Sequence, residues 1–271
     1  MKKNLVLTAA FGFGIQQLEL FVKTLRKYYT DDICFIIGFN DRVIEQELKK
    51  YNCIIIKKNI DKRDVQSKRY DFFLEFLKDK NYENIFCCDS RDIYFQSNPF
   101  DFNYEGSINF FLEDKEINNC PYNSNWIIKT YGAAAYKEVS KKIILCSGTV
   151  LGSLEKMREY LTLMKDKILK IKYRKSLKYL LTFRRDPEGR GCDQGHANYL
   201  VNKQYINECF FYSNAEGPIA TVFYLKKLHF DKQLRLLNIY NKPYSVVHQY
   251  DKRWDEFSFT VNKIKESLNI K

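Results

Sequence analysis

The chain has 271 residues, of which 45% are hydrophobic and 16% aromatic, so it can bury a large core and is not expected to be disordered. Its net charge of +12 favours an anionic partner, such as a nucleotide, a phosphorylated substrate or an acidic lipid. Without a zinc finger, an aromatic sheet signature or a heptad array beside that charge, we expect no nucleic-acid partner.

The first half of the chain alternates short apolar runs with amphipathic segments. The apolar runs predict strands at 4–8, 33–39, 53–58 and 84–89. The amphipathic segments predict helices at 15–25, 41–51 and 67–79. This alternation is typical of a mainly parallel sheet, which binds ligands beyond the carboxyl ends of its strands.

The second half is less regular. Apolar runs predict strands at 107–114, 141–153, 217–224 and 244–250, and one or two basic helices at 153–183. A further helix is expected to begin at Asp193, a residue type that suits the N-cap. Trp126 and Tyr131 fall in a stretch predicted to be irregular, where they could be buried or stack on a sugar. With no linker in the chain, we predict a single α/β domain over residues 1–271, with helices on a mainly parallel central sheet and a small antiparallel portion in the second half.

The cysteines and the N-terminal stretch bear on location. The eight cysteines form no C-x-x-C pair, which argues against structural zinc and favours reduced thiols buried in the core. The stretch "MKKNLVLTAAFGFGI" has the charge and apolar content of a signal peptide, but Gly12 and Gly14 interrupt it. We therefore expect a first core strand there, and a cytoplasmic protein or one peripheral on the inner face of a membrane.

Two acids follow the fourth predicted strand, in "IFCCDSRDIYFQ". Carboxylates at the end of a parallel strand can hold Mg²⁺ or Mn²⁺, whose remaining positions are filled by phosphates or water. Alternatively, Arg91 pairs with Asp89 or Asp92 at the surface, an interaction that would contribute little to stability. The spacing of these residues leaves both interpretations open.

A basic stretch covers residues 165–185. Its bases are Lys165, Lys167, Lys170, Lys172, Arg174, Lys175, Lys178, Arg184 and Arg185. A basic amphipathic helix can lie on an anionic membrane, where it would meet a lipid-linked acceptor. The alternative is a helix that packs on the domain with its charged face in water.

Five segments together resemble GT-A-type nucleotide-sugar glycosyltransferases, and they occur in that family's order between Leu5 and Trp254. They are "LVLTAAFGFGI", "SKRYDFF", "CCDSRDIYFQSNPF", "LCSGTVLGS" with "GCDQGHANYL", and "VVHQYDKRW". The pattern is most similar to viral and bacterial enzymes that act on surface glycans, and more distantly to the glycogenin-like family. The resemblance implies a GT-A-like (Rossmann-like) fold, with a nucleotide-binding half at about 1–115 and a donor-sugar and acceptor half at about 116–271.

The resemblance assigns a metal site. Asp89 and Asp92 are similar to the D-x-D motif, although two residues separate them instead of one. This departure leaves open which of the two acids is the direct ligand, and we favour Asp92, with Asp89 on the ribose or a metal-bound water. His248 resembles the late histidine that completes the coordination, and an imidazole suits Mn²⁺ better than Mg²⁺. Taken alone, His248 is better interpreted as a core histidine, and the set of motifs reverses that preference.

The donor-binding residues also follow from the resemblance. Thr8, Ala9 and Ala10, with Phe11, are similar to the segment along the base and ribose, and Ser147 and Gly148 to the floor of the sugar pocket. The remaining residues implied in donor binding are Arg69 near the diphosphate, Ser90 and Arg91 in the metal motif, and Lys252 at the leaving diphosphate. Arg69 and Lys252 could instead be solvated surface bases.

Asp193 and Gln194 resemble the pair beneath the reacting sugar. In inverting relatives the acid is the general base, and in retaining relatives this position helps to orient the sugar or the acceptor. The late histidine favours retention. His196 and Asn198, one turn further on, are interpreted as packing residues.

The resemblance implies a metal-dependent glycosyltransferase that moves a sugar from a nucleoside-diphosphate sugar, with UDP expected, to a glycan or lipid-linked acceptor. A sugar nucleotidyltransferase is the first alternative, but "TAAFGFG" lacks the Arg or Lys that such enzymes carry after the first strand. A basic, membrane-associated protein without enzymatic activity is the second alternative.

Overall fold

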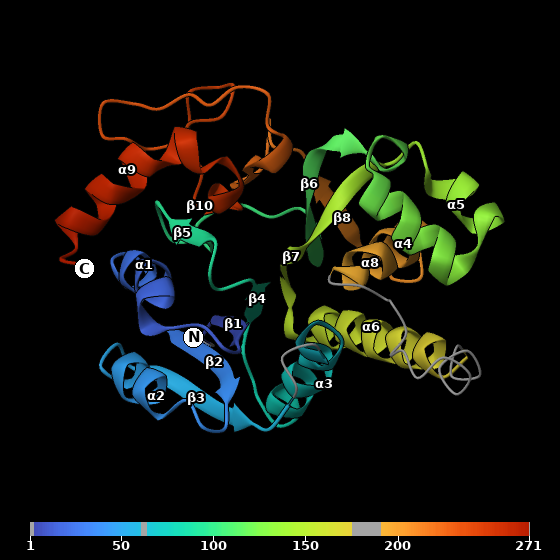
Figure 1. Ribbon diagram of the computed structural model, residues 1–271, viewed down its shortest axis with the longest axis horizontal. Coiled ribbons are helices and arrows are strands. Elements are labelled where there is room, and N and C mark those ends of the chain that lie inside the picture. The colour runs from blue at the N-terminus through green and yellow to red at the C-terminus, as the bar shows by residue number, and fades with distance from the viewer. Residues whose placement is uncertain (1–2, 61–63, 175–190, 271) are drawn as a thin grey trace.

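The computed structural model describes residues 3–60, 64–174 and 191–270. In this part of the chain a seven-stranded sheet carries helices on both faces, and a separate three-stranded sheet lies beside it (Figure 1). The strands are β1 (Leu5–Ala10), β2 (Asp32–Gly38), β3 (Cys53–Lys58), β4 (Asn84–Cys88), β5 (Ile93–Phe95), β6 (Ile108–Glu116), β7 (Ile143–Ser153), β8 (Cys209–Tyr212), β9 (Ile219–Thr221) and β10 (Val246–His248).

The helices alternate with the strands in the first half of the chain and cluster in the second. They are α1 (Ile15–Arg26), α2 (Arg42–Lys49), α3 (Val65–Leu77), α4 (Pro121–Tyr131), α5 (Ala133–Val139), α6 (Leu154–Arg174), α8 (Cys192–Asn202) and α9 (Trp254–Ser267). Short 3₁₀ helices span Ile117–Asn119, Val222–Tyr224 and Tyr250–Arg253.

The large sheet has the strand order β3-β2-β1-β4-β7-β6-β8. All neighbouring strands pair in parallel except β7, which runs antiparallel to both β4 and β6. The α/β architecture with a mainly parallel sheet is thereby confirmed, and β7 supplies an antiparallel strand in the second half. Because β1, β4 and β6 point the same way, their carboxyl ends meet at one edge of the sheet.

The central strand β1 is buried on both faces, as expected for a parallel strand covered by helices. Leu5 and Leu7 face the core formed with α3, α6 and α8, whereas Val6 faces the core formed with α1 and α2. Its alternating apolar side chains therefore join the two helical layers to one sheet.

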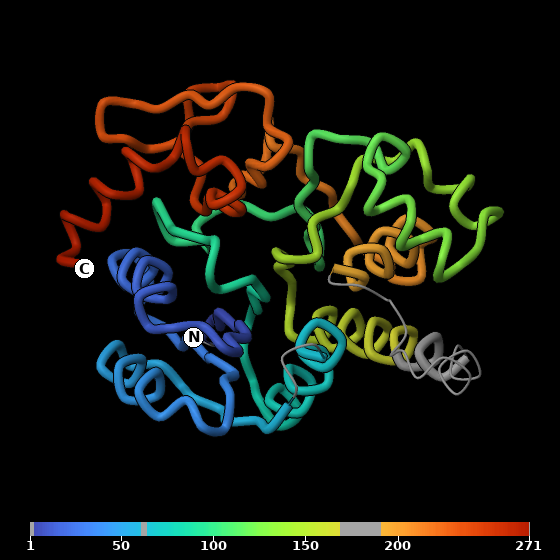
Figure 2. The backbone as a smooth tube through the Cα atoms, in the orientation of Figure 1, coloured from blue at the N-terminus to red at the C-terminus, as the bar shows by residue number. Residues whose placement is uncertain are grey.

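The small sheet has the order β5-β10-β9 and sets the position of His248. The strand β5 begins directly after Asp92, and β10 pairs with it antiparallel, so that His248 lies opposite Ile93. The backbone N–H of Gln249 then donates a hydrogen bond to the backbone carbonyl of Asp92 at 2.8 Å. The segment between β9 and β10 folds back over α9 (Figure 2). Phe230 of this segment packs edge-on against Phe257 of α9.

Three local expectations were wrong. Gly191, not Asp193, is the N-cap of α8, because the backbone there takes the left-handed conformation (φ +94°) that glycine adopts at little cost. Trp126 and Tyr131 lie in α4, which begins with Pro121 at a position that tolerates its missing N–H. The strand expected at 217–224 ends at Thr221 and continues as a 3₁₀ helix.

The basic stretch is described only in part. Helix α6 accounts for it as far as Arg174, while Lys175, Lys178, Arg184 and Arg185 lie outside the described residues. Lys165 forms a salt bridge with Asp71 of α3 at 2.8 Å, so part of the basic face packs on the domain. Of the helices that the structure describes, none combines the length and apolar character needed to cross a membrane.

Gln96 links the small sheet to the segment that covers it. Its buried amide donates to the carbonyls of Leu236 and Tyr244 and accepts from the Leu236 N–H. We predict that Gln96→Leu lowers the free energy of unfolding by about 2–5 kcal/mol, since the change leaves the Leu236 N–H and the Tyr244 carbonyl unpaired and takes one of two donors from the Leu236 carbonyl. Urea unfolding measures this loss, and Gln233→Leu, at an exposed position, is the control expected to change it by less than about 0.5 kcal/mol.

Candidate metal centre

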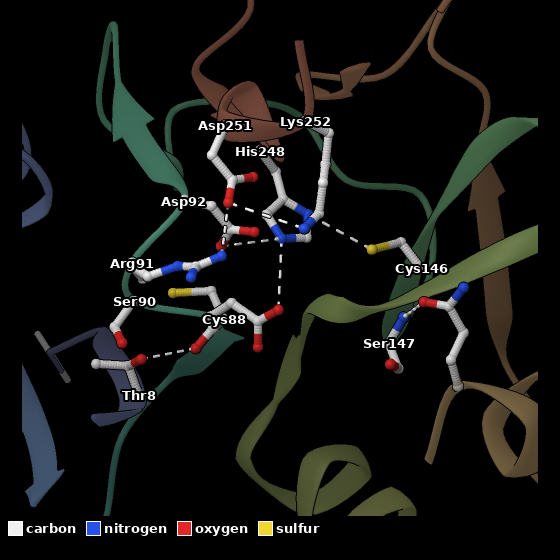
Figure 3. A network of polar contacts seen from close by, with 12 residues as sticks. Thr8, Cys88, Ser90, Arg91, Asp92, Cys146, Ser147, His248, Asp251 and Lys252 are labelled. Carbon is white, nitrogen blue, oxygen red and sulfur yellow. Dashed lines mark hydrogen bonds and ion pairs between the residues drawn. The ribbon is translucent and has the colours of Figure 1, made fainter. Parts of the chain in front are cut away.

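Asp89, Asp92 and His248 converge at the carboxyl edge of the sheet. Figure 3 shows Asp92 and His248 close together there. Asp89 directly follows β4, Asp92 directly precedes β5, and His248 ends β10. One ligand atom from each residue lies within 4.8 Å of the others. Two carboxylates and one imidazole are a ligand set that suits a divalent cation, so this group can hold a metal ion.

The histidine nitrogen that faces the acids has no hydrogen-bond partner in the described part of the chain. His248 Nε2 is buried and lies 3.5 Å from Asp89 Oδ2 and 3.7 Å from Asp92 Oδ1. The other ring nitrogen, Nδ1, contacts Cys146 Sγ at 3.5 Å and so fixes the ring orientation. A buried nitrogen without a partner, aimed between two carboxylates, fits the geometry of a metal ligand.

The charges of the cluster act on one another. Burial alone would raise the pKa of Asp89, but the neighbouring His248 and Arg69 lower it below its ordinary value. Burial, together with the charges of Asp89 and Asp251, raises the pKa of Asp92. Burial opposes a charged His248, yet Cys146 and the two acids raise its pKa well above the usual range. The two acids therefore favour a positive charge between them.

Gly148 leaves the space in which this cluster forms. A Cβ atom at this position would lie 2.5 Å from Asp89 Oδ2 and 2.7 Å from His248 Cε1. The Gly148 carbonyl also accepts the Asp89 N–H at 2.9 Å, so β7 holds the residue that follows β4. Any larger residue at position 148 must displace one of the three candidate ligands.

Arg69 of α3 connects the metal cluster to α8. Its Nη1 donates to Asp89 Oδ1 at 2.8 Å, and its Nη2 donates to Asp193 Oδ2 at 2.5 Å. Asp193 also accepts from the Tyr70 hydroxyl at 3.2 Å, and the Ser147 hydroxyl lies 3.5 Å from it. Asp193 is thus a buried carboxylate paired with a guanidinium, rather than a helix cap.

Gln194 occupies the centre of a second polar group. Its carbonyl oxygen accepts from the Ser147 N–H at 3.4 Å, and its amide nitrogen donates to Glu113 at 3.3 Å and to Asn123 at 3.4 Å. Glu113 is only 2% exposed, and burial raises its pKa from 4.5 to about 7. Glu113 was not predicted as a site residue, although it follows an apolar run in "SINFFLED" much as Asp89 follows "NIFCC".

Arg91 and Lys252 both approach Asp251, which lies near His248 (Figure 3). Arg91 pairs with Asp251 at 2.5 Å and lies over the Phe13 ring, whereas Lys252 approaches Asp251 only to 3.9 Å. The Asp251 Oδ1 atom is buried and has no hydrogen-bond partner among the described residues. Sequence reasoning also missed Asp251, and Arg91 pairs with it instead of with Asp89 or Asp92.

The end of β1 lies beside the end of β4, as the motif order implied. The Thr8 hydroxyl donates to the Cys88 carbonyl at 2.7 Å, and the Ser90 hydroxyl donates to the Ala9 carbonyl at 3.2 Å. The Ala9 side chain is partly exposed, whereas Ala10 is fully buried in the core. Phe11 packs on Phe72 with ring centroids 6.2 Å apart.

The two residues interpreted as packing residues pack in α8. His196 is fully buried, and its Nδ1 lies 2.8 Å from the Tyr131 hydroxyl. Tyr131 also stacks on Tyr199 with ring centroids 4.0 Å apart, which makes it part of the core and not a surface platform. Asn198 bonds both the N–H and the carbonyl of Leu145 and so ties α8 to β7.

Comparison of the sequence with models of known protein families found no match, and comparison with curated proteins found none either.

The Gly148 geometry predicts the effect of one added methyl group. Gly148→Ala should lower the affinity for Mn²⁺ at least about tenfold, because Asp89 or His248 must move out of the cluster. Gly14→Ala is the control, since its Cβ meets only the mobile end of Gln16 at 3.0 Å. Calorimetric titration with Mn²⁺ measures both variants, and an unchanged affinity in a folded Gly148→Ala protein would contradict the site.

The buried Glu113 predicts a pH dependence of stability. Because the folded protein raises the pKa of Glu113, folding binds a proton between about pH 4.5 and 7, and this contribution to stability is lost as pH rises through that range. Glu113→Gln carries no such charge. Relative to wild type, its free energy of unfolding should therefore increase by about 2.5 kcal/mol between pH 5 and pH 8, as measured by urea unfolding. A constant difference across this range would show that Glu113 has an ordinary pKa.

Proposed function

We propose that this protein is a metal-dependent glycosyltransferase of GT-A-like fold, which transfers a sugar from a nucleoside-diphosphate sugar. The observation that carries the proposal is the convergence of Asp89, Asp92 and His248 at the carboxyl edge of the parallel sheet. Ligands of such sheets bind at this edge, and the small residue Ala9 and the polar Ser90 border the same place. The order of the sequence motifs supports the nucleotide sugar as the ligand.

The three candidate ligands, two acids and one imidazole, suit Mn²⁺, with Mg²⁺ as the second choice. When bound, the ion would offset the negative charge that develops on the leaving diphosphate. Lys252 is half-exposed and only loosely paired, so its ammonium group can turn towards the diphosphate. Arg69 acts indirectly, since both of its terminal nitrogens are engaged in holding Asp89 and Asp193 in place.

The environment of Asp193 supports retention of the anomeric configuration. Inversion needs a free base beneath the sugar, but Asp193 is already paired with Arg69 and hydrogen-bonded to Tyr70. In the proposed reaction the acceptor oxygen bonds to the anomeric carbon as the bond from that carbon to the phosphate oxygen breaks. The acceptor proton passes to the leaving phosphate, and Gln194 presents its carbonyl oxygen beside the sugar.

The proposed acceptor is a glycan or a lipid-linked glycan, as in polysaccharide biosynthesis, and the proposed location is the cytoplasm or the inner face of a membrane. The basic composition of residues 165–185 supports this acceptor, although Lys165 itself pairs with Asp71 and Lys167 lies over the Tyr205 ring. The donor base proposed is uridine, which rests on the family resemblance.

The proposal predicts metal-dependent turnover of the donor. In a panel of UDP-, GDP-, dTDP- and CDP-sugars with Mn²⁺, one should raise the melting temperature, and the protein should hydrolyse that sugar slowly. EDTA and Asp92→Asn should each lower the hydrolysis rate at least about a hundredfold, because the charge on the leaving group is no longer offset.

Asp79→Asn, at an exposed acid outside the site, is the matched control and should hydrolyse the donor at the wild-type rate. Full hydrolysis in EDTA would exclude the metal-dependent mechanism. Thermal stability that no member of the panel changes would contradict donor binding.

A further inference from the structure

Glu113 is a buried carboxyl group that the proposed reaction does not use. It lies near the carboxyl end of β6, the same edge of the sheet at which Asp89 follows β4. Among the described residues it accepts one hydrogen bond, from Gln194 at 3.3 Å, which is long for a bond to a charged acceptor. No Lys, Arg or His in the described ranges forms a salt bridge with it, and Lys115, its neighbour on β6, lies over the Tyr224 ring instead.

A buried carboxylate without a cation is costly unless other donors satisfy it. The polar and charged groups that act on Glu113 come from its own strand and from four elements packed around it. They are Gln194 of α8, Cys146 of β7, His248 of β10, Tyr224 of the 3₁₀ helix after β9, and Lys115 of its own strand. Of these, only Gln194 donates a hydrogen bond to the carboxylate, so the group keeps capacity to accept more.

The amides beside Glu113 leave oxygen atoms as acceptors. Asn123 directs its amide nitrogen to Cys120 Sγ at 3.3 Å, and Gln194 directs its nitrogen to Glu113 and Asn123. Each of the two carbonyl oxygens accepts one hydrogen bond, from the Ser147 N–H and from the Gln194 amide nitrogen, and keeps a second lone pair. Together with the Glu113 carboxylate they form a set that matches a ligand rich in O–H donors.

This acceptor set lies one contact away from the metal centre. The Gln194 side-chain oxygen accepts a hydrogen bond from the Ser147 N–H. The next residue is Gly148, where an added Cβ would clash with Asp89 and His248. A sugar attached to a diphosphate at the metal centre would extend along β7 over these residues.

We propose that Glu113, with Asn123 and Gln194, forms a subsite that accepts hydrogen bonds from hydroxyl groups of the sugar carried by the nucleotide. This inference rests on the proposed function, since the metal centre places the diphosphate. Glu113 thereby contributes to selecting a donor by its hydroxyl pattern, whereas the nucleotide alone does not contact it.

The test compares two ligands by calorimetry with Mn²⁺: the nucleoside diphosphate and the nucleotide sugar that the panel identifies. In Glu113→Gln and Glu113→Ala the nucleoside diphosphate should bind as in wild type. The nucleotide sugar should bind about tenfold to a hundredfold more weakly, since hydrogen bonds to a charged group are lost. Asp114→Asn is the matched control and should keep both affinities, because Asp114 pairs with Asn214 elsewhere.

The proton balance gives a second readout that a purely structural role would not change. Hydroxyl donors favour ionised Glu113, so at pH 7 the sugar should release about half a proton more than the nucleoside diphosphate does. Titrations in two buffers of different ionisation enthalpy measure this difference, which should vanish in Glu113→Gln.

Wild-type affinity for the nucleotide sugar in both Glu113 variants would overturn the subsite while leaving the proposed function intact, as would an equal loss in Asp114→Asn. A wild-type protein that binds no member of the panel would instead contradict the proposed function and remove the ligand on which the subsite depends.

Discussion

The double salt bridge of Arg69 is the interaction on which the arrangement of the site depends. One guanidinium, whose side chain is 13% exposed, binds the acid that follows β4 and the acid in the first turn of α8. Asp89 and Asp193 are 104 positions apart in the sequence. Both are held in place by their ion pairs with Arg69, and without that guanidinium their charges would be left uncompensated. Because Arg69 belongs to α3, the position of that helix on the sheet determines where Arg69 holds Asp89 in the metal centre.

The electrostatics of the site follow from this pairing. Arg69 neutralises one charge at Asp89, but Asp92 and the second oxygen of Asp89 still face each other across His248. Acids so close together need a positive charge between them, which either a protonated imidazole or a divalent cation can supply. Gly148 keeps this space open, and the neutral amide of Gln194 continues the polar surface towards Glu113. In the proposed function the site thus divides into a metal-binding part for the phosphates and an acceptor-rich part for the sugar.

The sequence predicted the parts of the fold that depend on local patterns. Alternating apolar runs and amphipathic helices were sufficient for the parallel sheet, and the position of Asp89 followed from the end of β4. The pairing of β5 with β10 joins residues about 150 positions apart and leaves no periodic signal, so only the motif order pointed to His248. Asp193 was wrongly expected to cap α8, because a left-handed Gly191 takes that role. Glu113 was missed because burial, which gives it its unusual pKa, cannot be read from one acid after an apolar run.

The central claim is that Asp89, Asp92 and His248 hold a divalent cation. Crystals grown with Mn²⁺ and a nucleoside diphosphate, with diffraction data recorded at the manganese absorption edge, test it most directly. The account predicts one anomalous peak within coordination distance, about 2.0–2.6 Å, of His248 Nε2 and of a carboxylate oxygen of Asp92 or Asp89. A peak bound only elsewhere on the protein, or well-ordered nucleotide at this edge of the sheet without any metal, would contradict it.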